Sequence, residues 1–252
     1  MDKGHVTVSN NGGIITASFF HPQSNSLPGE LLRELGDTIT TVSNMESTKV
    51  IILRSEGDKA FCAGASFDEL TAISTLEEGK KFFSGFAHVI NALRKSSKLV
   101  IGRVQGKAVG GGVGLASAVD YCFATTKAAV KLSELAVGIG PFVVGPAVER
   151  KIGVSAMSHL AINATNWQTA EWAKEKGLFN EIFETPEGMD EAIAALAEKL
   201  VSSNPEAMSE LKKIFWQGTE HWDTLLVERA GVSGKLVLSE FTRSAIAQFK
   251  TK

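Results

Sequence analysis

Hydrophobic positions in the first part of the chain alternate between extended and helical patterns. Two β-rich runs, His5–Val8 and Ile14–Phe19, flank the segment Asn10–Gly13, which is typical of a hairpin turn. Apolar residues recur at helical spacing after Pro28, which predicts a helix up to Val42. Further expected strands are Lys49–Arg54, Leu99–Val104, Tyr121–Thr125 and Val130–Leu132, and further expected helices are Leu76–Leu93 and Val113–Val119. Alternating strands and helices predict an α/β fold with largely parallel pairing.

From about Phe142 onward the pattern becomes helical, with one extended segment at Asn180–Phe183. The expected helices are Val143–Ile152, Ser155–Asn163, Thr169–Lys176, Pro186–Ser203, Pro205–Trp216 and most of Trp222–Phe249. We therefore expect an α/β core over residues 1–195 and a C-terminal helical region over residues 196–252.

Composition narrows the class of protein. The chain has 252 residues, 44% of them hydrophobic and 21% charged, with a net charge of −2. These values indicate a globular protein without the basic surface of nucleic-acid binders. No apolar run reaches the length of a membrane helix, and the N-terminus does not resemble a signal peptide, so we expect a cytoplasmic protein. Cys62 and Cys122 are expected to be reduced, and no His/Cys spacing suggests a metal site.

The stretch GKAVGGGVG, residues 106–114, is the first candidate for chemistry. Its spacing fits neither the phosphate-binding P-loop nor the Rossmann motif, and no G-x-S-x-G hydrolase elbow exists. The glycines follow an expected buried strand and open a short helix. Backbone N–H groups at such a position can bind a negatively charged oxygen, as in an oxyanion hole.

A second segment, KAFCAGASFDEL, precedes these glycines by about 45 residues. With VIILRSEGDKAFCAGA, LVIGRVQGKAVGGGVGLASAVDYCFAT, LSELAVGIGP and AKEKGLFNEIF, the chain resembles the crotonase (enoyl-CoA hydratase/isomerase) superfamily over nearly its whole length. The resemblance implies a ClpP-like spiral of repeated β-β-α units with C-terminal helices that drive trimerisation. It also implies an acyl-CoA substrate with no separate cofactor, and a homotrimer or a dimer of trimers, with neither nucleic acid nor membrane as a partner.

The resemblance also implies roles for particular residues. The amides of Ala65 and Gly111 would bind the thioester oxygen, and a side chain at Gly111 would crowd the thioester. Ala63, Gly64 and Ser66 would border coenzyme A. The remaining expected binding positions are Ser26 and Leu27 in an upstream loop, Gly110 beside the oxyanion amide, and Phe142 in the acyl pocket.

Family hydratases typically use two glutamates, and only one of the two positions is acidic here. The first is Gly114 and the second is Glu134. We expect Glu134 to be the acid–base residue, with a pKa raised by its apolar neighbours. The aspartate of the dienoyl-CoA isomerases is replaced by Phe142.

The presence of one carboxylate instead of two slightly favours isomerisation, which moves a double bond, over hydration. However, the Ser133–Pro141 segment resembles hydratases of branched or dicarboxylic enoyl-CoAs. A silent CoA-thioester binder stays open because Gly114, Ser66 and Asp68 depart from the family pattern. An acyl-CoA hydrolase or decarboxylase also stays open. Fatty-acid and branched-chain amino-acid breakdown both fit. Lys250 and Lys252 are candidate phosphate contacts.

Overall fold

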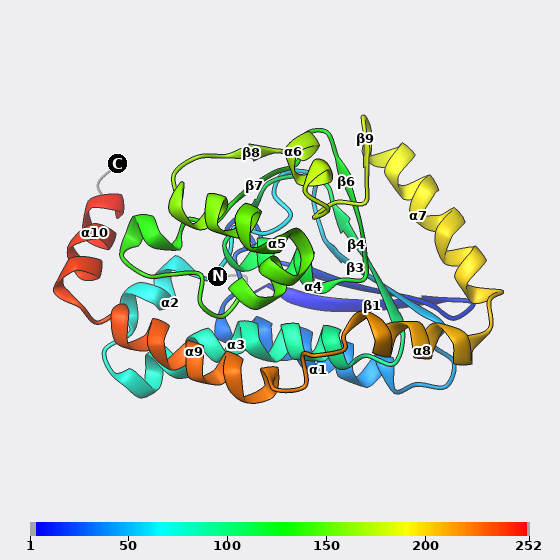
Figure 1. The fold of residues 1–252 in the computed structure, drawn as a ribbon, viewed down its shortest axis with the longest axis horizontal. Helices are drawn as coiled ribbons and strands as arrows, with labels where there is room; N and C mark the ends of the chain where they lie inside the picture. Colours follow the sequence, from blue (N-terminus) through cyan, green and yellow to red (C-terminus); the bar gives the residue numbers. More distant parts are fainter. Residues whose placement is uncertain (1–3, 251–252) are drawn as a thin grey trace.

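The computed structural model describes residues 4–250 and is built on a six-stranded sheet (Figure 1). The strand order is β1-β2-β3-β4-β6-β9, in which β1 and β2 are antiparallel and the other neighbours are parallel. A tight turn at Gly12 and Gly13, both with positive φ, joins the first two strands. The strands are β1 (His5–Asn11), β2 (Ile14–Phe20), β3 (Val50–Ser55), β4 (Leu99–Val104), β6 (Tyr121–Thr125) and β9 (Glu181–Phe183).

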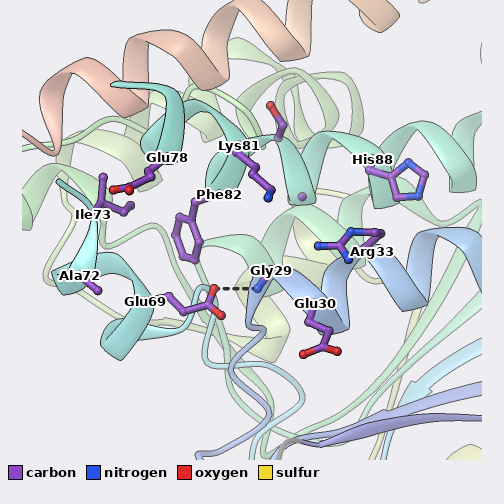
Figure 2. Close-up of a pocket in the computed structure, with 12 residues that line it drawn as sticks. Gly29, Glu30, Arg33, Glu69, Ala72, Ile73, Glu78, Lys81, Phe82 and His88 are labelled. Carbon is purple, nitrogen blue, oxygen red and sulfur yellow. Dashed lines mark hydrogen bonds between the residues drawn. The ribbon is translucent and has the colours of Figure 1, made fainter. Parts of the chain in front are cut away.

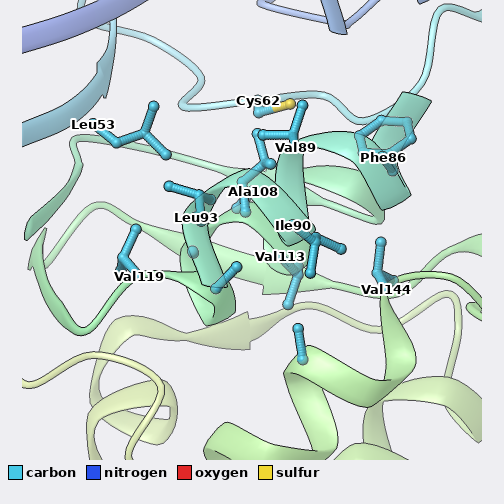
Figure 3. Close-up of a cluster of buried hydrophobic side chains, with 14 of the residues drawn as sticks. Leu53, Cys62, Phe86, Val89, Ile90, Leu93, Ala108, Val113, Val119 and Val144 are labelled. Atoms are coloured by element: carbon cyan, nitrogen blue, oxygen red, sulfur yellow. The ribbon is translucent and has the colours of Figure 1, made fainter. Parts of the chain in front are cut away.

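The inner strands β3 and β4 are buried on both faces of the sheet, since successive residues point to opposite sides and nearly all of them are buried. In β3, Ile51 and Leu53 belong to the main core (Figure 3), whereas Val50 and Ile52 pack in a second cluster with α7 (Pro186–Val201). The main core also includes buried residues of α1 (Gly29–Ser43), α3 (Leu76–Lys95) and α4 (Gly111–Ala118). Continuous apolar strands such as VIIL are the sequence signature of this two-sided burial.

The C-terminal helices are α8 (Pro205–Phe215), α9 (Trp222–Leu236) and α10 (Glu240–Lys250). Helix α9 runs along α3, and α10 lies at one end of the molecule (Figure 1). A buried ion pair, 2.7 Å between Lys212 Nζ and Asp120 Oδ2, ties α8 to the turn before β6. Helix α7 continues across the predicted boundary between residues 195 and 196, and the division into two regions stays a prediction.

A small second sheet and several short elements carry the loops near the glycine stretch. The sheet pairs β5 (Ala108–Val109) with β7 (Ala129–Lys131) in parallel, and β7 with β8 (Gln168–Thr169) antiparallel. The sequence predicts only one extended segment after Phe142, at Asn180–Phe183. That prediction was wrong, because Gln168–Thr169 also forms a short strand, β8. Helix α2 (Phe67–Ala72) and the 3-10 helix η1 (Glu134–Val137) were not expected, because each is too short to show a helical period.

The remaining helices are α5 (Gly145–Ile162) and α6 (Ala170–Glu175). The sequence predicts two helices where α5 lies, and the break between them corresponds to Gly153, whose φ of 76° and ψ of 161° are not helical.

Cys62 and Cys122 are buried free thiols, as expected, and burial raises the pKa of each to about 12. Within residues 4–250, no helix is both long and apolar enough to cross a bilayer.

Candidate active site

An apolar cavity of about 480 Å³ lies between the two glycine-containing loops and η1. Its walls include the loop around Ala65, the N-terminus of α4 at Gly111, and Glu134. Aromatic and aliphatic side chains form most of the rest, namely Phe67, Leu70, Phe83, Phe86, Val137, Ile139, Phe142, Val143 and Val144. A predominantly apolar cavity with few polar groups is the usual form of a small-molecule site.

The Ala65 amide faces the cavity because of how its loop pairs. Leu27 and Ala65 form a parallel β-bridge, in which Leu27 N donates to Gly64 O at 2.8 Å and Ser66 N donates to Leu27 O at 3.2 Å. In a parallel bridge these two bonds flank the central residue, whose own N–H points to the opposite side. Within residues 4–250, the Ala65 N–H accordingly has no acceptor.

The Gly111 amide is the first N–H of α4 and has no acceptor within the described part of the chain either. The preceding residue, Gly110, has a φ of 51°, and its N–H donates to Lys131 O at 2.8 Å, which ties the helix start to β7. The two loops approach closely, since a Cβ built on Gly64 would lie 3.6 Å from the Gly111 nitrogen. Two free amides from separate loops therefore border one cavity.

Glu134 is the first residue of η1 and places its carboxylate against Gly110. A Cβ on Gly110 would lie 2.8 Å from Glu134 Oε1. The Glu134 carbonyl accepts a hydrogen bond from Ile139 N at 3.0 Å, which fixes the turn, and the αL residue Gly138 ends it. Thr242 Oγ1 of α10 in turn donates to Gly138 O at 3.1 Å, so the C-terminal helix holds this turn from outside.

The Glu134 carboxylate is unusual in its burial and in its pKa. The residue as a whole is partly exposed, but Oε2 is buried and has no hydrogen-bond partner in the described residues. Burial raises the pKa of Glu134 to about 7, opposed only in part by a backbone hydrogen bond. A carboxylate with a pKa near neutrality both accepts and returns protons at physiological pH.

Packing between two helices requires glycine at position 111. A Cβ there would collide with the ring of Phe86 on α3. The glycine thus lets α4 pack directly on an aromatic wall of the cavity. At Gly110 the reason is the positive φ together with the adjacent Glu134 carboxylate.

Position 114, where the family's other glutamate would stand, is closed by Val144, which directly precedes α5. A Cβ on Gly114 would lie 2.6 Å from Cγ1 of Val144. Val144 itself lines the cavity. Its isopropyl group therefore takes up the space into which a side chain from position 114 would project.

Seven of the ten residues predicted from sequence line the cavity: Ala63, Gly64, Ala65, Gly110, Gly111, Glu134 and Phe142. Three do not. Leu27 is fully buried, Ser26 Oγ lies 3.2 Å from His21 Nδ1, and Ser66 caps α2 by accepting from Glu69 N.

The departures from the family pattern lie near these residues. Asp68 is exposed and accepts a hydrogen bond from Gln23 Nε2 at 3.0 Å. Lys250 is the last residue of α10, and Lys252 lies outside the described residues.

Lys131 is a cavity residue that the sequence analysis missed. The available signal was its position in the short strand Val130–Leu132, where it alternates with two apolar residues and shares a face with Ser133. Phe86 of α3 and Val144, the residue before α5, were not predicted, because tertiary packing and not a motif brings them to the cavity.

The arrangement suits a carbonyl compound that passes through an enolate. Two main-chain amides can stabilise a negative oxygen, and an adjacent carboxylate can move a proton on the neighbouring carbon. Within the described residues no group of His, Cys, Asp and Glu could hold a metal ion.

Comparison with known proteins relates this geometry to a family. A family model described as enoyl-CoA hydratase/isomerase matches residues 9–237. The chain is 29% identical to the short-chain-enoyl-CoA hydratase of Clostridium acetobutylicum over 255 residues, which covers 100% of this chain and 97% of that protein. It is 28% identical to the carnitinyl-CoA dehydratase of Escherichia coli K12, with 94% and 95% of the two chains covered.

Solved structures give the same fold. An enoyl-CoA hydratase from Bacillus halodurans superposes with a TM-score of 0.89 at 21% identity, covering 96% of this chain and 99% of that one. An enoyl-CoA hydratase from Mycobacterium smegmatis superposes with a TM-score of 0.80 at 26% identity, covering 98% and 96%. The expected crotonase fold is thus confirmed, and the chain belongs to the enoyl-CoA hydratase/isomerase family.

Proposed function

We propose that this protein transfers a proton within an enoyl-CoA thioester, with Glu134 as the acid–base residue and the amides of Ala65 and Gly111 as the oxyanion hole. The observation that carries the proposal is the convergence of two unpaired amides and one buried carboxylate on a single apolar cavity. Membership of the family supports an acyl-CoA substrate.

Isomerisation of the double bond is the reaction that the residues favour. Glu134 removes a proton from C2 of a 3-enoyl-CoA, and the electron pair moves through the conjugated system onto the thioester oxygen. The two amides stabilise this dienolate. Protonated Glu134 then returns the proton to C4, which re-forms the carbonyl and leaves a 2-enoyl-CoA. One carboxylate suffices, and Glu134 is the single acidic residue among those that line the cavity.

Hydration is the second candidate, because similar proteins from Clostridium acetobutylicum and Homo sapiens are named as hydratases. The human protein, methylglutaconyl-CoA hydratase, is 30% identical over 220 residues, or 86% of this chain and 64% of that one. In this reaction Glu134 would guide a water molecule to C3 while C2 gains a proton.

The test is a panel of 2-enoyl- and 3-enoyl-CoAs incubated in deuterium oxide, with products identified by mass spectrometry and NMR. Isomerisation moves the double bond without adding water, whereas hydration adds 20 mass units for D₂O. Absence of turnover across the panel, or full activity in the Glu134→Gln variant, would contradict the proposal.

A further inference from the structure

A lysine pair lies at the wall of the cavity, apart from the proposed proton-transfer groups. Lys131 Nζ lies 4.5 Å from the centre of the Trp167 ring, and Lys107 Nζ lies 4.9 Å from the same centre. Lys131 is a cavity residue, and Trp167 is 39% exposed. One indole ring thus positions two ammonium groups through cation–π contacts.

Neither lysine is paired with a carboxylate in the described part of the chain, residues 4–250, although eight other ion pairs form there. Burial lowers the pKa of Lys131, and the nearby positive charge of Lys107, held on the same indole ring, lowers it further. An anion placed beside the two ammonium groups would offset these positive charges.

The backbone places Lys131 next to the oxyanion amides. Lys131 is in register with Val109 in the small sheet, and its carbonyl accepts the hydrogen bond from Gly110 N. Lys131 and Gly111 both line the cavity. A ligand whose thioester oxygen engages the Gly111 amide would therefore lie in the same cavity as Lys131.

We propose that Lys131, assisted by Lys107 and Trp167, binds a carboxylate on the acyl chain, so that the preferred substrate is a short dicarboxylic monothioester of coenzyme A. This inference rests on the proposed function for the placement of the thioester. The phosphates of coenzyme A are the other anions of the ligand, but the whole pantetheine arm separates them from the thioester. The acyl carboxylate is the anion that would share the cavity with the thioester.

Calorimetry with saturated ligands tests this inference without turnover. Four probes vary the acyl carboxylate and the phosphates independently: butyryl-CoA, glutaryl-CoA, S-butyryl-pantetheine and S-glutaryl-pantetheine. Wild-type protein is expected to bind each glutaryl ligand more tightly than its butyryl counterpart. Lys131→Met is expected to weaken both glutaryl ligands by about 10- to 100-fold, as for loss of a charge-assisted hydrogen bond, and the butyryl ligands by less than about twofold.

Two further variants serve as controls. Lys131→Arg keeps the charge and should retain most of the preference for glutaryl ligands. Lys127→Met removes an exposed lysine of the turn before β7 and should leave all four affinities unchanged. Thermal unfolding of each variant establishes that the fold is intact.

Two results would overturn the inference. One is an equal loss for butyryl and glutaryl ligands in Lys131→Met, which indicates a structural role. The other is a loss confined to the two CoA ligands, which assigns the lysine to a phosphate. Failure of the proposed function is a separate result, because it appears as absence of enoyl-CoA turnover and does not alter these affinities.

Discussion

Two hollows of similar volume differ in the residues that line them and in the surroundings of their carboxylates. The cavity around Glu134 has a volume of about 480 Å³, and an open groove between α1, α2 and α3 has about 520 Å³ (Figure 2). The lining of the groove includes several charged side chains, namely Glu30, Arg33, Glu69, Glu78 and Lys81. Volume alone therefore does not distinguish a candidate active site.

Carboxylates show the difference most clearly. In the groove, Glu69 accepts a hydrogen bond from Gly29 N at 2.8 Å, which caps α1 (Figure 2). Glu78 forms the capping box of α3, and hydrogen bonds from Ser74 lower its pKa. In the cavity, burial raises the pKa of Glu134. Glu69 and Glu78 thus stabilise helix ends, whereas Glu134 Oε2 has no hydrogen-bond partner among the described residues.

The largest expected effect of a single substitution is that of Glu134→Gln. Loss of the proton acceptor should lower kcat by about 10³-fold, as for removal of a general base, while binding of a saturated acyl-CoA persists. The matched control is Glu30→Gln in the groove, which should change kcat by less than about twofold. Steady-state kinetics and calorimetry on both variants check this. Equal effects of the two substitutions would mean that the cavity and the groove do not differ in their importance for catalysis.

Gly111→Ala should lower kcat by about 10²- to 10³-fold, because its methyl group collides with Phe86 and displaces an oxyanion amide. Gly231→Ala on α9 is the control, since a Cβ there meets only Lys80 Cδ at 3.9 Å. That substitution should leave kcat unchanged and raise stability by about 0.5–1 kcal/mol. Comparable kcat values for the two variants would show that the Gly111 amide takes no part in the reaction.

The raised pKa of Glu134 also predicts a pH dependence of stability. The folded state holds this proton more tightly than the unfolded state, whose pKa is near 4.5. The resulting stabilisation is fully present below pH 4.5 and is lost as the pH rises through about 7. Between these two pH values the free energy of unfolding of the wild-type protein should fall by on the order of 3 kcal/mol through this group. The Glu134→Gln variant should not show this fall, and denaturant titration at a series of pH values measures it. Parallel curves for the two proteins would mean that Glu134 is not held in an apolar site.

The smallest effects are expected in the groove. Arg33→Ala and Lys81→Ala should each change kcat/KM by less than about twofold, because exposed surface substitutions rarely exceed about 0.5 kcal/mol. The same enoyl-CoA panel measures this. A tenfold loss in either variant would assign the groove a part in substrate binding.

Local patterns predicted much of the fold. Apolar runs such as Val50–Leu53 lie in the sheet because burial on both faces leaves no other stable placement. The break at Gly153 was also visible, since it separates two helical periods. Helix α2 was not, because six residues give less than two turns and a cap rather than a period defines its start.

The residues of the site likewise fall into those that a local motif predicted and those that it did not. Glu134 and the glycines lie in short continuous motifs, so resemblance to a family was enough to locate them. The contact between Lys131 and Trp167 joins residues from different loops, and only the folded chain brings them together. The collision that requires glycine at 111 likewise involves Phe86 of a separate helix, which no local pattern encodes.

The most direct test of the central claim is a crystal structure with butyryl-CoA, a saturated thioester that cannot undergo either proposed reaction. The account predicts that the thioester oxygen lies within about 3.1 Å of both the Ala65 and Gly111 nitrogens, with the Glu134 carboxylate facing C2 of the acyl chain. A thioester oxygen that contacts neither amide, or an acyl chain bound in the groove between α1, α2 and α3, would contradict it.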